Sequence, residues 1–344
     1  MKNTNNPTVT VLMAAYNVEP YISEAIKSVL AQDYTDFEIV IVEDGSTDKT
    51  RAVLNSFKDK RIVKIYNSEN KGLIHSLNIG LEAARGRYIA RFDSDDIMLP
   101  GRLKQQVAYL EKHPKVDVIS AQTIVINDKG YRTGMFFNPL TKYGSEIGLL
   151  AKCTIAHNCV TVRAEMFKRL GLCYSDEYIY MEDYGLWANV AGNAKMHITP
   201  HRFAVYRKYE NSTTDRVYND KEKETTLIDS RRKVLRLLMD KYEISLPEYL
   251  FENYVRAMAF QKDVNHAELC LAMSSIISQI PKKKKIAVIT LLIYYWGIWW
   301  KITEGKTTGS HYFWLNFGAY IFQLVKRCER KFYRIAKLKI SKVV

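Results

Sequence analysis

The sequence predicts an α/β protein with a mostly parallel central sheet, and three observations support this class. Short runs of apolar and β-branched residues recur through the first hundred positions, as in strands that are buried on both faces. Segments with apolar residues at helical spacing separate these runs. The 344 residues, of which 47% are hydrophobic and 26% charged, are enough to bury a large core. Strands that alternate with helices in this way form a parallel sheet with covered faces.

Four strand–helix units are expected within residues 8–112. The expected strands cover residues 8–16, 37–42, 61–66 and the hydrophobic segment that ends just before Asp93. The expected helices cover residues 22–30, 48–57, 73–84 and 102–112. Ser46 precedes the second helix at a position where its side chain can cap the first turn.

The rest of the chain is expected to be less regular. Strand-like segments at 116–120 and 123–127 lead into a mixed region that extends to about residue 210. Within this region Glu182 and Asp183 form a carboxylate pair among aromatic residues. Residues 220–280 have the pattern of helices, and the first of these is highly charged.

Polar clusters follow all four of the early strands. They are Tyr16-Asn17, Glu43-Asp44, Asn70-Lys71-Gly72 and Asp93 to Asp96. Ligands of open α/β sheets bind beyond the carboxyl ends of the strands. Each cluster alone is a weak signal, but their shared placement predicts one binding edge.

The aspartates after the fourth strand are candidate metal ligands. Asp93 and Asp95 place hard oxygen ligands at the sheet edge, where they suit Mg²⁺ or Mn²⁺. Such ions take one or two protein carboxylates and complete their shell with substrate phosphates and water. Asp96 is instead expected to accept hydrogen bonds from backbone amides of the following turn. An isolated Asp-x-Asp would be read as a solvated acidic turn, but here three other polar clusters share the edge.

The charge distribution and the cysteine content indicate the kind of partner and the compartment of the protein. Residues 281–344 hold fourteen lysines and arginines and two glutamates, so +12 of the chain's net +14 lies in this tail. The nearly neutral body argues against nucleic acid as a partner, and a basic tail with an apolar run favours an anionic membrane surface. Five cysteines without a CxxC pair fit reduced thiols in the cytosol. We expect no signal peptide, because a polar start leads directly into a short strand.

The tail has two segments of interest. Residues 286–300 carry no charge, but fifteen residues are fewer than the roughly 20 needed to span a bilayer. Their tyrosines and tryptophans suit the headgroup region. Residues 311–342 mix aromatic and basic residues in an amphipathic pattern. The alternative is a helical subdomain that packs its aromatic residues on the catalytic core or on a second subunit.

Taken in order, these motifs resemble a known family. The chain closely resembles family 2 glycosyltransferases with the GT-A fold, of the bacterial surface-polysaccharide type. The motifs that carry the resemblance are, in order, AAYN, EDGSTD, NKGL, the stretch from LNIG to GRL that contains FDSDD, and EDYGLW. The resemblance covers about residues 8–215. It implies transfer of a sugar from a nucleotide diphosphate sugar to an acceptor hydroxyl, with inversion.

The resemblance also implies site roles, position by position. The catalytic base would be Asp183. Asp95 would bind the metal, Mn²⁺ or Mg²⁺, and Asp93 would share the metal or hold the ribose. The residues implied for nucleotide-sugar binding are Ala15, Tyr16, Asn17, Glu19, Asp44, Lys71, Asp93, Ser94 and Asp95. The acceptor-site candidates are His157, Glu182 and Trp187.

Alternatives remain open at several of these positions. The alternative for Lys71 is a solvated loop lysine, and the alternative for Glu182 is a residue that only orients its neighbours. The alternative for Trp187 is a core residue, and for His157 it is a core histidine hydrogen-bonded to the backbone. Family members often carry a histidine metal ligand two residues after the arginine of a Tyr-Arg pair. Here Tyr209 occupies that position, so the segment supplies no histidine ligand.

The combined expectation is a metal-dependent inverting glycosyltransferase on the cytoplasmic face of the cell membrane, with a UDP-sugar donor and a lipid-linked saccharide acceptor. Residues 1–218 would form the GT-A domain, with a nucleotide-sugar half at about 8–100 and an acceptor half at about 101–218. Residues 219–280 would be a helical extension and 281–344 a membrane-associating tail. A homo-oligomer is compatible with the sequence. The alternatives are a non-catalytic scaffold, which three intact aspartates oppose, and a nucleotidyltransferase, which the lack of an early glycine-rich loop opposes.

Overall fold

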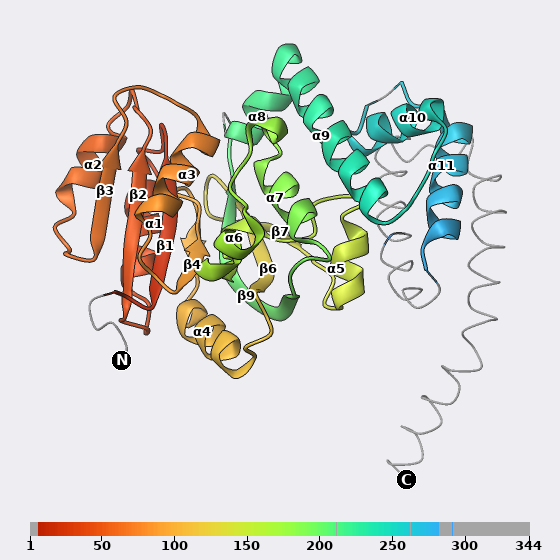
Figure 1. Ribbon diagram of the computed structural model, residues 1–344. Helices are drawn as coiled ribbons and strands as arrows, with labels where there is room; N and C mark the ends of the chain where they lie inside the picture. Colours follow the sequence, from red (N-terminus) through yellow and green to blue (C-terminus); the bar gives the residue numbers. More distant parts are fainter. Residues whose placement is uncertain (1–5, 211, 262, 282–290, 292–344) are drawn as a thin grey trace, which may run out of the picture.

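A computed structural model describes residues 6–210, 212–261, 263–281 and 291 of the protein (Figure 1). It confirms the α/β class with a nine-stranded sheet. The first four strands lie in the order β3-β2-β1-β4 and are all parallel. Their bounds are β1 Val9–Ala15, β2 Phe37–Glu43, β3 Ile62–Tyr66 and β4 Tyr88–Arg91. All four strands were predicted from the sequence.

Helices cover both faces of this parallel part. Alternate side chains of β1 point to opposite faces: Val9, Val11 and Met13 pack with helices α1, α2 and α4, whereas Leu12 packs with α3. The bounds are α1 Ile22–Leu30, α2 Thr50–Ser56, α3 Leu73–Ala83 and α4 Arg102–Lys112. The predicted cap of α2 is wrong, because the helix begins after Lys49 and the Ser46 hydroxyl accepts a hydrogen bond from the Asn17 amide instead.

The second half of the sheet is mixed. It contains β5 Ile97–Met98, β6 Val118–Asn127, β7 Arg132–Phe136, β8 Thr161–Arg163 and β9 Met196–Lys208. Strand β8 joins the two halves by pairing antiparallel with both β4 and β6. Strand β9 runs parallel to β6, and β5 pairs antiparallel with β9. The segments 116–120 and 123–127, expected as separate strands, belong to the single strand β6.

Short helices and three long ones complete the described chain. The short ones are α5 Lys142–Gly148, η1 His157–Cys159, α6 Ala164–Leu170, η2 Asp176–Tyr178, α7 Glu182–Val190 and α8 Thr213–Tyr218. The helices predicted in 220–280 are α9 Lys221–Lys241, α10 Glu248–Met258 and α11 His266–Gln279. No helix within the described ranges is both long enough and apolar enough to cross a membrane. Apart from residues 281 and 291, the predicted membrane tail lies outside the described residues.

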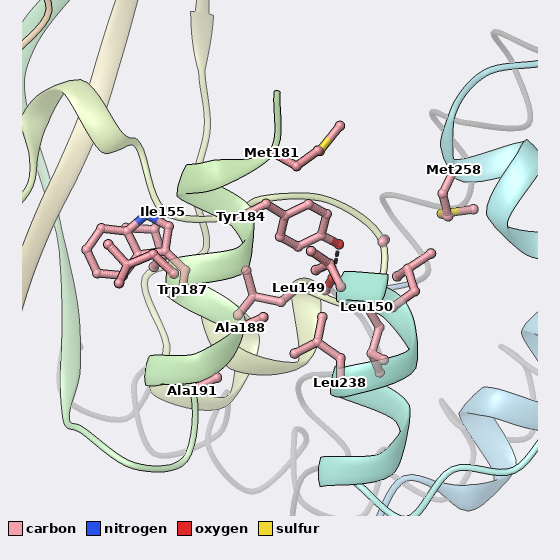
Figure 2. Close-up of a cluster of buried hydrophobic side chains, with 14 of the residues drawn as sticks. Leu149, Leu150, Ile155, Met181, Tyr184, Trp187, Ala188, Ala191, Leu238 and Met258 are labelled. Atoms are coloured by element: carbon pink, nitrogen blue, oxygen red, sulfur yellow. Dashed lines mark hydrogen bonds between the residues drawn. The ribbon is translucent and has the colours of Figure 1, made fainter. Parts of the chain in front are cut away.

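Helix α7 links the sheet to the C-terminal helices. Figure 2 shows Tyr184 and Ala188 of α7 facing Leu149, Leu150 and Leu238, whereas Trp187 lies on the other side of the helix beside Ile155. The Tyr184 hydroxyl donates to the Leu149 carbonyl. The Lys241 ammonium at the end of α9 donates to three carbonyls at the end of α7, at 2.7–3.0 Å. The position of α7, which carries Glu182 and Asp183 in its first turn, therefore depends on α9.

Candidate active site

The Asp44 carboxylate organises the carboxyl edge of the parallel strands. It follows β2, is 3% exposed, and accepts hydrogen bonds from the backbone amides of Lys71 and Gly72 at 3.0 and 2.9 Å. The amide nitrogen of the Asn67 side chain donates to it at 2.6 Å. These contacts hold the loop after β3 against the end of β2. The convergence of these two clusters, predicted from the sequence, is confirmed, whereas the Lys71 side chain itself is exposed.

The loop after β1 joins the same edge. Asn17 adopts a left-handed conformation (φ 52°), and its side-chain carbonyl accepts the Thr47 amide at 2.9 Å. The Glu19 carboxylate accepts the Lys49 amide at 3.1 Å. Ala15 is buried at the end of β1, and Tyr16 is half-buried. The loops after β1 and β2 are thus held together by side-chain to backbone hydrogen bonds.

Asp93 and Asp95 lie at the end of β4. The Asp93 carboxylate pairs with Arg91 (Nη2 to Oδ1, 2.6 Å), and Asp95 Oδ2 accepts the Tyr209 hydroxyl at 2.9 Å. Burial and the neighbouring Asp93 charge raise the pKa of Asp95 to about 6. Ser94 between them is 5% exposed. Two adjacent carboxylates that destabilise each other's charge fit a bound divalent cation, which would relieve the repulsion.

The described residues contain no group of three or more His, Cys, Asp or Glu arranged to hold a metal alone. This fits an ion held by Asp93 and Asp95 whose shell is completed by substrate phosphates and water. Such an ion would bind with its substrate rather than as a permanent structural metal.

Asp96 is structural, but its predicted partners are wrong. Its carboxylate is 1% exposed and accepts the Asn158 side-chain amide at 2.6 Å and the Arg207 backbone amide at 3.0 Å. The backbone amides of the following turn are not its partners. Asp96 therefore joins β4 to η1 and to β9 across the sheet.

Tyr209, which stands where the resemblance led us to look for a histidine, contacts Asp95 directly. Besides its bond to Asp95, its ring packs on the Tyr21 ring with centroids 4.5 Å apart. The Arg207 guanidinium lies over the Tyr21 ring, 5.0 Å from its centroid. Burial and the Asp95 charge raise the pKa of Tyr209, so its hydroxyl stays protonated and donates.

Glu182 and Asp183 occupy the first turn of α7. One oxygen of Asp183 accepts the Tyr184 backbone amide at 2.6 Å. Burial and the adjacent Asp183 charge raise the pKa of Glu182 to about 7, and burial also raises the pKa of Asp183. A carboxylate with a raised pKa is a stronger base than an ordinary aspartate, as proton abstraction from a hydroxyl requires.

His157 and Trp187 lie beside this turn. Their rings meet edge to face at 5.7 Å, and His157 Nε2 is hydrogen-bonded to the Tyr174 hydroxyl at 3.1 Å. Burial lowers the pKa of His157 well below its ordinary value, so the imidazole is neutral. Trp187 is 1% exposed and part of the core of Figure 2. Both residues are therefore core residues that border the site, and the His157 partner is a side chain rather than the backbone.

Arg91 connects the two carboxylate sets. It is 4% exposed, and the charges of Asp93 and Glu182 outweigh its burial and raise its pKa. Arg91 was not predicted as a site residue from the sequence. It could have been, because it is a charged residue in an otherwise apolar strand, two positions before Asp93. Tyr174 was missed without any comparable local signal. The site thus has one carboxylate set at the sheet edge and a second, buried set in the first turn of α7, and the charge of Arg91 interacts with both sets.

Comparison with known proteins defines the family. The model of glycosyl transferase family 2 matches residues 10–171. The chain is 36% identical over 231 residues to an uncharacterized glycosyltransferase of Haemophilus influenzae, a match that spans 64% of this chain and 71% of that protein. It is 36% identical over 183 residues to the UDP-Glc:alpha-D-GlcNAc-diphosphoundecaprenol beta-1,3-glucosyltransferase WfaP of Escherichia coli, spanning 53% of this chain and 69% of WfaP.

Solved structures agree on the fold. TarS 1–349 of S. aureus in complex with UDP-GlcNAc has a TM-score of 0.58 at 20% identity, over 87% of this chain and 89% of that one. The mannosyltransferase PcManGT of Pyrobaculum calidifontis, in complex with GDP-Man and Mn2+, has a TM-score of 0.53 at 18% identity, over 87% and 88%. The fold is that of a GT-A transferase. The chain belongs to glycosyltransferase family 2 and is a glycosyltransferase.

Proposed function

We propose that this glycosyltransferase is metal-dependent and inverting, and that it moves a sugar from a UDP-sugar to a hydroxyl of a lipid-linked saccharide. The observation that carries this proposal is one buried arginine whose charge interacts with two carboxylate sets. Asp93 and Asp95 lie at the sheet edge, and Glu182 and Asp183 lie on α7. Arg91 forms an ion pair with Asp93, and the Glu182 charge also acts on it. An inverting displacement needs a cation-binding site on one side of the sugar and a base on the other.

On the donor side, the loops after β1, β2 and β3 would bind the nucleotide through Tyr16, Asn17, Glu19, Asp44 and Lys71, with Ala15 and Ser94 shaping the edge. Asp95 and Asp93 would hold Mn²⁺ or Mg²⁺ on the diphosphate. When bound, the ion stabilises the negative charge that the leaving nucleoside diphosphate acquires. The Tyr209 hydroxyl orients the Asp95 carboxylate for this role.

On the acceptor side, Asp183 would take the proton from the attacking hydroxyl. The Asp183 carboxylate accepts the Tyr184 amide through one oxygen and is also hydrogen-bonded to the Cys153 thiol, which together fix its orientation. Glu182, the neighbouring carboxyl on α7, would position the acceptor. Attack from the side opposite the diphosphate inverts the anomeric centre, and no covalent intermediate with the enzyme is needed.

The donor and acceptor classes are supported by relatives. WfaP is named for a UDP-Glc donor and a diphosphoundecaprenol-linked acceptor, and TarS was solved with UDP-GlcNAc. A lipid-linked acceptor requires that the enzyme reach a membrane surface. The basic, aromatic tail predicted at 281–344 has the composition for this, which would place the enzyme peripherally on the cytoplasmic face.

Hydrolysis of nucleotide sugars tests the donor and metal proposals together. The full chain is incubated with a panel of UDP- and GDP-sugars and Mn²⁺ or Mg²⁺, and nucleoside diphosphate release is measured. We expect slow release from one UDP-sugar, dependent on the cation and lost in Asp95→Ala. Asp128→Ala, an exposed aspartate in the turn after β6, is the matched control and retains release. Release without a cation would contradict metal dependence.

Asp183→Asn separates the enzyme from a non-catalytic scaffold. The amide cannot accept the proton, so we expect transfer to a saccharide acceptor to fall by about 10²–10⁴-fold. Binding of the UDP-sugar by calorimetry should stay near the wild-type value. The exposed Asp176→Asn on η2 is the control. Unchanged turnover in Asp183→Asn would refute the assignment of the base.

A further inference from the structure

Three side chains beside the two carboxylate sets carry buried nitrogen atoms without a hydrogen-bond partner among the described residues. They are Arg91 (Nε and Nη1), His157 (Nδ1) and Trp187 (Nε1). Buried polar groups in folded proteins are nearly always hydrogen-bonded, and exceptions indicate a ligand or an ordered water. Arg91 and Trp187 are 4% and 1% exposed, so bulk water does not satisfy these atoms.

The three side chains lie together on one face of the sheet. Arg91 ends β4, which contacts η1, where His157 lies, and its charge helps to lower the pKa of His157. The His157 ring meets the Trp187 ring at 5.7 Å, and Trp187 is one helical turn after Asp183 on α7. The Tyr174 hydroxyl occupies the other nitrogen of His157. The unbonded nitrogens are thus gathered between β4 and α7.

This place lies between the proposed leaving group and the proposed base. Arg91 is bonded to Asp93 at 2.6 Å, and its charge also acts on the Glu182 and Asp183 carboxyls. In an inverting transfer the sugar occupies the space between the diphosphate and the base. Arg91 is bonded to the carboxylate on one side of this space, and its charge acts on the carboxyls of the other side, which places it against the sugar rather than against the nucleotide.

The chemistry of the nitrogens defines what they bind. Guanidinium and indole N–H groups only donate hydrogen bonds, so their partner offers acceptor oxygens. Asp93, Glu182 and Asp183 surround Arg91 with negative charge, which disfavours an anionic sugar. Hydroxyl and acetamido oxygens of a neutral sugar satisfy both conditions.

We propose that Arg91, His157 and Trp187 form the subsite for oxygen atoms of the sugar that is transferred, with Arg91 as its central donor. The inference rests on the proposed function and assigns His157 and Trp187 to the donor sugar rather than to the acceptor. Arg91 then has two tasks, because it orients Asp93 through Nη2 and binds the sugar through Nε and Nη1.

Calorimetry on the full chain with Mn²⁺ tests the subsite, with UDP, UDP-glucose and UDP-GlcNAc as probes. Arg91→Lys keeps the charge but removes the planar fork of N–H donors. We expect affinity for UDP to stay within about twofold and affinity for the preferred UDP-sugar to fall about tenfold, the loss of one charged hydrogen bond. The control is Arg163→Lys, which makes the same change at an arginine whose three nitrogens are all hydrogen-bonded within the protein, and which leaves both affinities unchanged.

Two results would overturn the inference. If Arg91→Lys lowers the affinities for UDP and for the UDP-sugar equally, Arg91 acts only through Asp93. If it leaves both affinities unchanged but raises the KM for the acceptor, the three side chains belong to the acceptor site. Trp187→Phe removes one N–H donor and keeps an aromatic ring. We expect it to lower the affinity for the UDP-sugar but not for UDP, by less than Arg91→Lys does, and it provides the test if Arg91→Lys does not fold. A wild type that binds no nucleotide at all would refute the proposed function, whereas one that binds UDP but none of the sugars would refute this inference alone.

Discussion

At the residue scale, the proposed base, Asp183, is one member of a coupled pair. Glu182 and Asp183 are adjacent and buried, and burial raises the pKa of both carboxyls. The Tyr184 amide and the helix N-terminus favour the charged form of Asp183. Protons leave such a pair in two steps that belong to the pair as a whole. Each carboxyl therefore influences the pH at which the other becomes a base.

This coupling predicts a shift in the pH profile of Glu182→Gln. The base must be ionised, so kcat/KM of the wild type falls as pH decreases through the raised pKa of the pair. The glutamine removes a neighbouring negative charge, which makes Asp183 easier to ionise, and the acid limb moves to lower pH. The profile is measured between about pH 5 and 8. Glu177→Gln on η2 should keep the wild-type limb, and a limb that moves upward in Glu182→Gln would refute the coupling.

Local motifs identified only some of the site residues. Asp93, Asp95 and Asp183 lie within short motifs, so they could be predicted as site residues from their neighbours in the sequence. The partners of Asp96 could not be predicted in this way, because Asn158 and Arg207 are 62 and 111 positions away. The same holds for the contact of Tyr209 with Asp95, 114 positions apart. Contacts between distant segments depend on the mixed half of the sheet, which has no clear sequence pattern.

At the element scale, strand length and burial explain which strands were predicted. Strands β1, β2 and β4 are buried along almost their whole length and consist mainly of apolar residues. The edge strand β3 is only half-buried, but its β-branched residues still predict a strand. Strands β5 and β8 have two and three residues, too few to show a period. Strand β9 has thirteen residues but includes Pro200 and several charged positions, which argue against a strand when read alone.

Helix α7 is positioned by a close approach at Gly185. A Cβ at this position would overlap the ring of Tyr178 in η2. Gly185 is 2 positions after Asp183, so the packing that it permits also sets the place of the base. The glycine is required by space rather than by backbone conformation, because it lies inside a helix.

Gly185→Ala should therefore destabilise the protein. Alanine is the better helix former by about 1 kcal/mol, so helix propensity alone predicts a higher Tm. We expect a lower Tm instead, together with reduced transfer, because α7 must move away from Tyr178 and carry Asp183 with it. Thermal unfolding and kcat give the readouts. Gly134→Ala in β7, where a Cβ meets nothing within 4 Å, should change neither, and a Tm increase at Gly185 would contradict the packing argument.

At the scale of the whole molecule, the helical region shares its core with the catalytic sheet. Leu235 and Leu238 of α9 and Tyr254 of α10 belong to the same buried cluster as Leu12 of β1 and Trp187 of α7. The Tyr254 hydroxyl also donates to the Leu150 carbonyl at 2.6 Å. Residues 221–279 therefore support the active site directly. Leu291 is buried in this cluster as well.

The concentration of positive charge after residue 281 predicts how the enzyme reaches a lipid-linked acceptor. Each lysine near an anionic membrane contributes about 1 kcal/mol to binding, so replacing Lys282, Lys283, Lys284 and Lys285 by glutamine should weaken vesicle binding by at least about tenfold. These substitutions are preferable to ending the chain near residue 280, because that truncation also removes the buried Leu291. Flotation of the full chain with anionic and with zwitterionic vesicles measures the effect.

The matched control replaces four exposed lysines of the body, Lys58, Lys60, Lys112 and Lys115, and lowers the net charge by the same amount. If attraction depended only on net charge, both variants would lose binding equally. We expect the body variant to float with anionic vesicles like the wild type and the tail variant to remain unbound. Both variants should hydrolyse the donor at the wild-type rate, since neither replaces a residue proposed for the site. Equal flotation of the tail variant and the wild type would refute the membrane role and favour packing of the tail on protein.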